Sequence, residues 1–255
     1  MKRHSLRSSR FAIGFLAGLL SLAAPALAGP PLICHSIEIG SAQSLPWTSP
    51  ATLTGLKDYD ASHLITDTLA LLSPNTPVLV RMETLRRATI YAQRDPIIAK
   101  QLLLKLQERT TANERDALAA FDFGYLTACY REIQRARSQG MTVWGHGEWP
   151  NPGADVDGYG FVKKAIGMGE NAEMEFAAAL ITMEGSQSEH EEHMRNAMAG
   201  AKGNPLLSQN LANQFSKTAR NQANFTTWRL DTLIPERRAS IWHCIDRKDR
   251  VSRIS

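Results

Sequence analysis

Long apolar runs and cysteines are both scarce in this 255-residue chain, which contains only three cysteines. Beyond the N-terminal region, no apolar run approaches the roughly 20 residues that a transmembrane helix needs. The chain also contains no glycine-rich phosphate loop and no G-x-S-x-G motif. These absences argue against a membrane-spanning mature protein, a P-loop nucleotide enzyme and a serine hydrolase of the nucleophile-elbow type.

The first 28 residues have the three parts of a cleavable secretory signal peptide. Four basic residues lie between positions 2 and 10, an apolar run of about a dozen residues follows from Phe11, and Ala26 and Ala28 form an A-x-A cleavage site. The run is too short for a membrane anchor. We therefore expect cleavage after Ala28, no membrane span in the mature protein, and a periplasmic or secreted location.

Cleavage removes the excess of positive charge. The whole chain has 29 basic and 25 acidic residues, and the first 28 residues hold four of the basic ones and none of the acidic ones. The mature chain is therefore balanced at 25 against 25. Because nucleic-acid binding needs an excess of basic charge on the domain, we expect no nucleic-acid partner.

The three cysteines allow one disulfide in an oxidising compartment. Cys129 shares a helical face with Leu126 and Ile133, as expected of a small buried apolar side chain. Cys34 and Cys244 lie near the two ends of the mature chain. We expect a disulfide between Cys34 and Cys244 and a buried free thiol at Cys129, although three pairings are possible.

The apolar periodicity predicts an all-α protein with an irregular beginning. Residues 29–60 are rich in Pro, Ser, Thr and Gly and show no sustained period, whereas apolar residues recur at three and four positions from residue 61 onward. We expect one helical domain over 61–255. It divides into helical units at about 62–139 and 157–216, a loop at 140–156 that is dense in Gly and Pro, and a capping segment at 217–255.

Capping residues place several helix starts. Asp95 before Pro96 and Thr76 before Pro77 each combine a capping side chain with a proline suited to the first helical position. Further helices are expected at about 113–139, 157–166, 171–184, 188–201 and 204–216.

Two stretches of about 34 residues, 62–95 and 171–204, each fit a pair of helices, and this spacing resembles the tetratricopeptide repeat. The resemblance implies antiparallel helical hairpins stacked into an α-solenoid. The family's aromatic and glycine signatures are mostly missing, and Arg81 and His190 occupy a position that usually holds a small residue. The residues that match the pattern are Ile65, Thr68, Leu69, Leu72, Leu85 and Ala88 in the first unit and Met174, Ala177, Ala178, Ile181, Met194 and Ala197 in the second.

One cluster has the composition of a metal site. His190 and His193 are three residues apart on an expected helix, and Glu189 could add a carboxylate for zinc or another divalent ion. The second histidine comes one residue too early for H-E-x-x-H, and His190 also fits a packing position before Ala197. Packing therefore stands as the alternative, and no cofactor is required by the sequence.

The loop at 140–156 holds the other candidate site, formed by Trp144, His146, Glu148 and Trp149. Tryptophans beside glycines often stack on ligands, and a histidine near a carboxylate can transfer protons. The alternative is that the tryptophans pack into the core, because leaving both in water would forgo the burial of about 150–250 Å² each. We expect at least one of them to be buried.

These observations favour a non-enzymatic, exported helical-repeat protein that binds a protein or peptide along a concave face, because no complete catalytic constellation is present. The alternative is an exported hydrolase, with or without a metal, that uses His146 or the pair His190 and His193. Stoichiometric zinc in the purified protein would favour the hydrolase.

Overall fold

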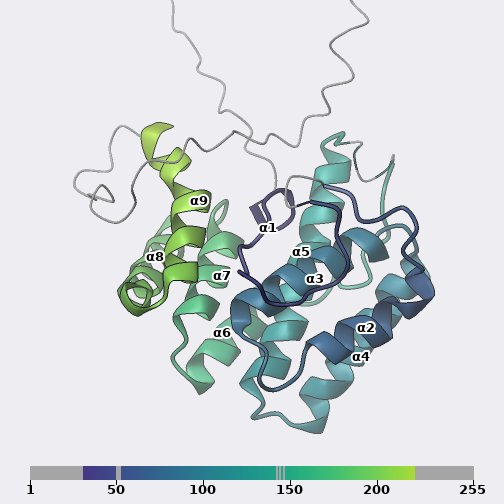
Figure 1. The fold of residues 1–255 in the computed structure, drawn as a ribbon, viewed down its shortest axis with the longest axis horizontal. Coiled ribbons are helices and arrows are strands. Elements are labelled where there is room, and N and C mark those ends of the chain that lie inside the picture. The colour runs from purple at the N-terminus through teal and green to yellow at the C-terminus, as the bar shows by residue number, and fades with distance from the viewer. Residues whose placement is uncertain (1–30, 50–52, 142, 144, 146, 222–255) are drawn as a thin grey trace, which may run out of the picture.

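The computed structural model describes residues 31–49, 53–141, 143, 145 and 147–221 (Figure 1). This part of the chain is helical and contains no β-strand, which confirms the all-α prediction. Within it, no helix combines the length and the apolar character that crossing a bilayer requires. The predicted signal peptide and most of the predicted capping segment lie outside the described residues.

In the described part of the chain, a short helix precedes eight longer ones. The bounds are α1 Pro31–Cys34, α2 Leu64–Leu71, α3 Val78–Ala92, α4 Pro96–Ala112, α5 Ala117–Ser138, α6 Gly158–Met168, α7 Ala172–Thr182, α8 Gln187–Gly200 and α9 Pro205–Asn221, with 3₁₀ turns at Ala61–His63 and Ala201–Gly203.

The core lies around α3 and α5, which occupy the middle of the molecule (Figure 1). Every residue of α3 except Arg87 is buried, as expected for a helix that is surrounded by other elements. In Figure 1, α2 and α4 lie on one side of this pair and α7, α8 and α9 on the other. Successive odd-numbered helices touch, since α3 contacts α5, α5 contacts α7 and α7 contacts α9.

The two stretches of 34 residues do not occupy equivalent places. The first contains α2 and α3, and the second contains α7 and α8, which pack closely as a hairpin. The short helix α1 contacts the second helix of the first stretch, α3, but the first helix of the second stretch, α7. Equal spacing in the sequence therefore does not correspond to one repeated register here.

A pair of glycines lets α5 and α6 approach closely. A Cβ atom on Gly124 would lie 2.6 Å from the carbonyl oxygen of Gly158, and one on Gly158 would lie 2.7 Å from that of Gly124. These neighbours are backbone atoms, which give way less easily than a flexible side chain. Side chains at either position would therefore force the two helices apart.

Most of the predicted helix starts agree with the structure. Asp95 caps α4 by accepting from the amides of Ile97 and Ile98, and Asn171 caps α7. The prediction for Thr76 is wrong, because α3 begins at Val78 and its N-cap is Pro77, which has ψ 151°. The hydroxyl of Thr76 instead donates to the carbonyl oxygen of Leu71 at the end of α2.

Candidate functional site: an N-terminal strap and the face that binds it

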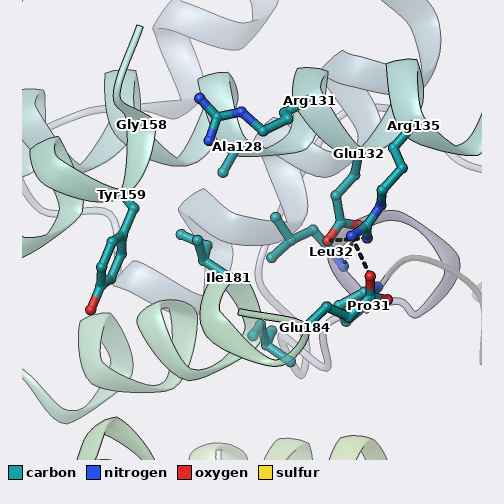
Figure 2. A pocket seen from close by; sticks show the side chains of 11 residues that line it. Pro31, Leu32, Ala128, Arg131, Glu132, Arg135, Gly158, Tyr159, Ile181 and Glu184 are labelled. Carbon is teal, nitrogen blue, oxygen red and sulfur yellow. Dashed lines mark hydrogen bonds and ion pairs between the residues drawn. The ribbon is translucent and has the colours of Figure 1, made fainter. Parts of the chain in front are cut away.

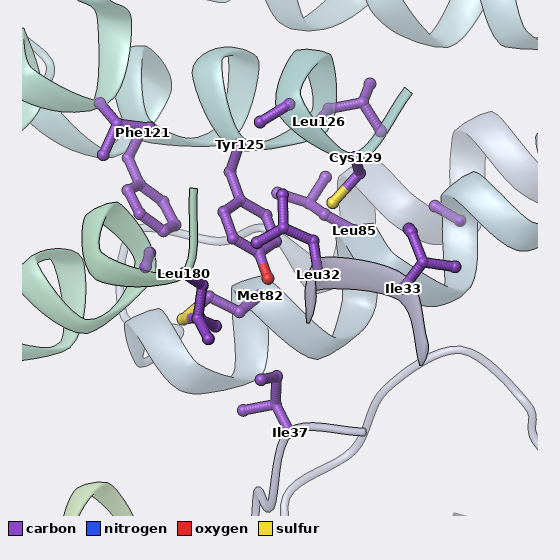
Figure 3. Close-up of a cluster of buried hydrophobic side chains, with 14 of the residues drawn as sticks. Leu32, Ile33, Ile37, Met82, Leu85, Phe121, Tyr125, Leu126, Cys129 and Leu180 are labelled. Atoms are coloured by element: carbon purple, nitrogen blue, oxygen red, sulfur yellow. The ribbon is translucent and has the colours of Figure 1, made fainter. Parts of the chain in front are cut away.

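Residues 31–49, which we call the strap, lie against the inner helices and bury part of their side chains there, while residues 40–43 are exposed. The strap begins with α1, and α1 contacts α3, α5 and α7. Four apolar side chains of the strap are at most 3% exposed, and Figure 3 shows three of them among residues of α3, α5 and α7. These four are Leu32, Ile33, Ile37 and Leu45. The irregular segment expected from the sequence is therefore part of the core.

The first turn of the strap is held by Glu132 of α5. The amide of Leu32 donates to Oε2 of Glu132 at 3.0 Å, and the side chain of Arg135 lies 3.7 Å from Oε1. Burial raises the pKa of Glu132 to about 8, and it outweighs the opposing effects of Arg135 and of the amides of Leu32 and Ile33. Glu132 is therefore a buried acceptor for the strap that holds its proton up to neutral pH.

The middle of the strap is held by an ion-pair network on α3. The amide of Ile37 donates to Oε2 of Glu83 at 2.9 Å, and Arg86 donates to both oxygens of the same carboxylate. Arg86 also donates to the carbonyl oxygen of Ile33, and Arg87 donates to Glu83 at 2.7 Å. One carboxylate therefore ties two arginines and the strap together.

The charge state of Glu83 follows from this network. Burial alone would raise its pKa, but the charges of Arg86 and Arg87 and the amide of Ile37 outweigh it, and the pKa of Glu83 is lowered from its usual range. Because both Glu83 and Arg86 are wholly inaccessible to solvent, the pair would be costly to break by removing one partner. Loss of one partner would leave an uncompensated charge inside the protein, next to the strap.

The side chain of Asn210 in α9 bonds to both the amide and the carbonyl group of one strap residue, Glu38. Its Oδ1 accepts from the amide of Glu38 at 2.8 Å, and its Nδ2 donates to the carbonyl oxygen of the same residue at 2.9 Å. A side-chain amide has one acceptor and two donors, which suits it to both groups of a single residue. This clamp joins residues that are 172 positions apart and needs no particular side chain on the strap.

The end of the strap is held by groups of α3. Arg87 donates to the carbonyl oxygen of Leu45 at 2.6 Å, and the hydroxyl of Tyr91 donates to that of Pro46 at 2.6 Å. The guanidinium groups of Arg86 and Arg87 lie 5.2 and 5.7 Å from the ring centroid of Trp47. Such cation–π contacts add attraction that does not depend on a hydrogen bond.

We call the strap-contacting surface of α3, α5 and α9 the strap-binding face. Its side chains bond mainly to amide and carbonyl groups, while apolar surroundings receive the side chains of the strap. This chemistry recognises an extended polypeptide, because the main chain supplies bonds at any sequence and the apolar surroundings discriminate between side chains. The residues that form the face are Glu83, Arg86, Arg87, Tyr91, Glu132 and Asn210.

A pocket of about 120 Å³ lies at the N-terminal end of the strap (Figure 2). Its polar rim includes Arg131, Arg135 and Glu184, and Arg135 forms an ion pair with Glu184 and lies 3.7 Å from Glu132. Arg131 donates to the carbonyl oxygen of Val156 at 3.0 Å. The full lining is Pro31, Leu32, Ala128, Arg131, Glu132, Arg135, Gly158, Tyr159, Leu180, Ile181 and Glu184.

The aromatic loop is only partly described. Trp149 is 3% exposed and packs edge-on against Tyr130 at 5.2 Å between ring centroids, which confirms that at least one tryptophan is buried. Glu148 is exposed, and Trp144 and His146 lie outside the described residues. Because Trp149 packs into the core, its ring is not presented to a ligand.

The predicted metal ligands bond to different partners. His193 Nδ1 lies 2.5 Å from Glu175 Oε2 and its Nε2 lies 2.7 Å from the hydroxyl of Tyr159, whereas Nδ1 of His190 bonds to a main-chain carbonyl oxygen 2.8 Å away. Glu189 pairs with Lys163 at 3.2 Å. In the described part of the chain, no group of three or more His, Cys, Asp or Glu residues is placed to hold a metal ion.

Glu175, His193 and Tyr159 form a hydrogen-bonded chain across α7, α8 and α6. Burial and the charge of Glu189 raise the pKa of the Tyr159 phenol well above its usual value, so this hydroxyl is a donor and not an anion at neutral pH. The ring of Tyr159 lines the pocket, but its hydroxyl points away from the other lining residues (Figure 2). The chain therefore joins three helices without opening into the pocket.

The predicted disulfide lies partly beyond the described chain. Cys129 is a free thiol with no exposure to solvent, as predicted, and burial raises its pKa well above the usual value. Cys34 is buried in α1. Cys244 lies outside the described residues, so its pairing with Cys34 stays a prediction.

Comparison with known proteins found no relative of this chain. No family model, curated protein or solved structure matches the chain significantly. Function must therefore be inferred from the geometry of the chain itself.

The residues of the strap-binding face were missed by sequence reasoning. Glu83, Arg86 and Arg87 are spaced at three and four positions, which usually indicates ion pairs on an exposed helix surface. The signal that distinguishes them is their position in a helix whose remaining residues are largely apolar or small. Asn210 gives no such signal, since its partner is remote in the sequence.

Proposed function

We propose that this protein is an exported helical-repeat scaffold that binds an extended polypeptide segment, with its own strap as the resident occupant of the binding face. The observation that carries the proposal is the two-way bond between Asn210 and the main chain of Glu38. Such a pair of bonds recognises the peptide main chain, and any partner segment has the same main-chain groups as the strap.

The alternation of helices supports a solenoid of tetratricopeptide type. Helices α3, α5 and α7 all contact α1, and α9 contributes the Asn210 clamp. In solenoids, successive units present equivalent helices on a shared binding surface. In this chain the equivalent helices would be α3, α5, α7 and α9, a register shifted from that of the two 34-residue stretches, and the strap contacts these helices.

The partner expected from this chemistry is a protein segment that, like the strap, forms one helical turn and continues without regular secondary structure. Apolar side chains at the positions of Leu32, Ile33 and Ile37 would enter the surroundings that now bury these residues. Selectivity would come from these apolar contacts, and main-chain bonds would contribute affinity at any sequence. Neither a metal nor another cofactor takes part.

Strap exchange tests the proposal. Residues 50–52 of the mature chain are replaced by the recognition sequence of a specific protease, and the protein is folded, reduced and then cleaved. We expect a fluorescent peptide of residues 31–49 to replace the cleaved strap, as measured by anisotropy, and a peptide of the same composition in scrambled order to remain free.

Two asparagines of α9 provide a matched pair of variants. Asn210→Ala removes two bonds to the strap, and at about 1 kcal/mol for each we expect roughly thirtyfold weaker binding. Asn213→Ala changes a residue on the same helix that has no bond to the strap and should bind as the wild type does. Equal affinities of the two variants, or no binding of the labelled peptide to the cleaved protein, would contradict the proposal.

A second candidate, an exported hydrolase, is favoured by one observation, the chain of Glu175, His193 and Tyr159. A carboxylate that orients an imidazole is a common arrangement for proton transfer. Ester hydrolysis that is lost in His193→Gln, while the melting temperature is retained, would support this candidate. Stoichiometric zinc in the purified protein would indicate a metal-dependent form.

A further inference from the structure

The side chain of Trp47, near the end of the strap, lies against three residues of α3. Its ring packs edge-on against Tyr91, with 5.7 Å between the ring centroids and 81° between the ring planes. The guanidinium carbons of Arg86 and Arg87 lie over the same ring, at 5.2 and 5.7 Å from its centroid. We call Arg86, Arg87 and Tyr91 the aromatic subsite. Both kinds of contact need a π system, so an aliphatic side chain would gain neither of them.

Tyr91 is held in place by residues outside the strap. The centroid of its ring lies 4.4 Å from that of Tyr59, and the hydroxyl of Tyr59 donates to Asp67 of α2 at 2.7 Å. The amide of Leu56 donates to the hydroxyl of Tyr91 at 2.9 Å. None of these contacts involves residues 31–49, so the ring of Tyr91 stays held when the strap leaves.

The two arginines are held by Glu83, which also lies outside the strap. Arg86 donates to both oxygens of this carboxylate, and Arg87 donates to its Oε1 at 2.7 Å. The carboxylate therefore orients both guanidinium groups before a ring is placed beneath them. A subsite that is formed in advance costs less to occupy than one that must be ordered on binding.

The subsite makes contacts to the ring of Trp47 but leaves its N–H group without a bond. Nε1 of Trp47 is buried and has no hydrogen-bond partner in the part of the chain that the structure describes. A buried donor without a partner weakens binding. An aromatic side chain that lacks this donor therefore avoids a cost that the indole incurs.

We propose that the aromatic subsite selects partner segments that have an aromatic ring at the position of Trp47. This position comes nine residues after the one that Asn210 clamps, since 47 minus 38 is 9. The proposal rests on the proposed function and names the side chain that a partner segment needs at this point. Phenylalanine, which has a ring and no N–H group, fits this requirement.

Competition in the strap-exchange assay tests the proposal. Unlabelled peptides of residues 31–49, either unchanged or carrying Trp47→Phe or Trp47→Leu, compete with the labelled peptide for the cleaved protein. Burial of leucine and of phenylalanine contributes comparable free energy, so a subsite that is only apolar would bind the two alike. We expect the phenylalanine peptide to bind within about threefold of the unchanged one, and the leucine peptide roughly tenfold more weakly.

The control is Gln43→Leu, which places leucine at an exposed position of the strap and should bind as the unchanged peptide does. Binding of the unchanged peptide together with equal affinities of the Trp47→Phe and Trp47→Leu peptides would overturn the aromatic subsite alone. No binding of the unchanged peptide would contradict the proposed function.

Unfolding of the uncleaved chain in guanidinium chloride, with reductant present, tests the subsite without any exchange. The midpoint of Trp47→Phe should lie close to that of the wild type. The midpoint of Trp47→Leu should be lower, by the shift that corresponds to the same roughly tenfold change in equilibrium constant. Equal midpoints of the two variants would overturn the proposal.

Discussion

Two buried acidic side chains, one ionised and one protonated at neutral pH, help to determine where the strap lies. Glu83 and Glu132 both accept main-chain amides of the strap, but their surroundings differ. Glu83 faces two arginines at 2.7–2.8 Å, whereas the nearest guanidinium nitrogen to Glu132 lies at 3.7 Å. Burial is therefore outweighed at Glu83 and dominates at Glu132, and the pKa values of the two carboxylates shift in opposite directions.

The pH dependence of Glu132→Gln tests this difference. The pKa of Glu132 is about 8 in the folded protein against 4.5 ordinarily, so the folded state retains a proton that the unfolded state has lost between these values. Raising the pH through this window therefore destabilises the wild type, by on the order of a few kcal/mol. The glutamine side chain of the variant imitates the protonated carboxyl and does not titrate.

Chemical denaturation of both proteins between pH 4 and 8.5 provides the measurement. The free energy of unfolding of the wild type, relative to the glutamine variant, should fall as the pH rises from about 4.5 to 8. A difference that stays constant, or that moves in favour of the wild type, would show that burial does not raise the pKa of Glu132.

At the scale of elements, the close approach of α5 and α6 depends on glycine. The Cβ of Gly124→Ala would meet backbone atoms of Gly158 and Val162 at 2.6 and 2.9 Å, and we expect a loss of about 1–3 kcal/mol in stability or more. Gly167→Ala is the matched control in α6, because it is exposed and has no atom within 4 Å. It should gain up to about 1 kcal/mol from helix propensity.

Thermal unfolding of both glycine variants distinguishes tight packing from a general effect of alanine. A lower melting temperature for Gly124→Ala together with an unchanged or higher one for Gly167→Ala is the expected pattern. If Gly124→Ala unfolds at the temperature of the wild type, α5 and α6 are farther apart than the structure places them.

Sequence reasoning recovered the elements that depend on local signals. Asp95 and Asn171 precede apolar periodic runs, and each caps the helix expected there. Threonine is also a common N-cap residue, but the hydroxyl of Thr76 donates to the carbonyl oxygen of Leu71 at the end of α2. The local sequence does not show which of these two bonds the hydroxyl forms. Local chemistry therefore placed most helices and misjudged one start.

The candidate site could not be predicted in this way, because its contacts are remote in the sequence. Glu83 and Ile37 are 46 positions apart, and Glu132 and Leu32 are 100 apart. The composition of residues 29–60 correctly indicated a lack of long helices, yet gave no sign that the strap enters the core. The sequence also indicated tryptophans and histidines as candidate ligand-binding residues, although Trp149 packs against Tyr130 and His193 bonds to Glu175 within the fold.

At the scale of the whole molecule, the predicted disulfide would close a loop of 210 residues, since 244 minus 34 is 210. On the chain-entropy model, such a link stabilises the folded state by on the order of 5 kcal/mol. Reduction of the wild type should therefore lower its midpoint in guanidinium chloride markedly. The Cys34→Ser variant should unfold at the midpoint of the reduced wild type whether or not reductant is present. A midpoint of the wild type that does not respond to reductant would contradict the link.

The central claim is that the strap is an integral, clamped part of the fold, and hydrogen exchange at its amides measures this most directly. In the mature wild type, followed by NMR, the amides of Leu32, Ile37 and Glu38 should exchange slowly because each donates to a buried side chain. In Asn210→Ala, the amide of Glu38 should exchange faster, while Asn213→Ala leaves all three protected. Exchange of these amides in the wild type at the rate of an unfolded peptide would contradict the account.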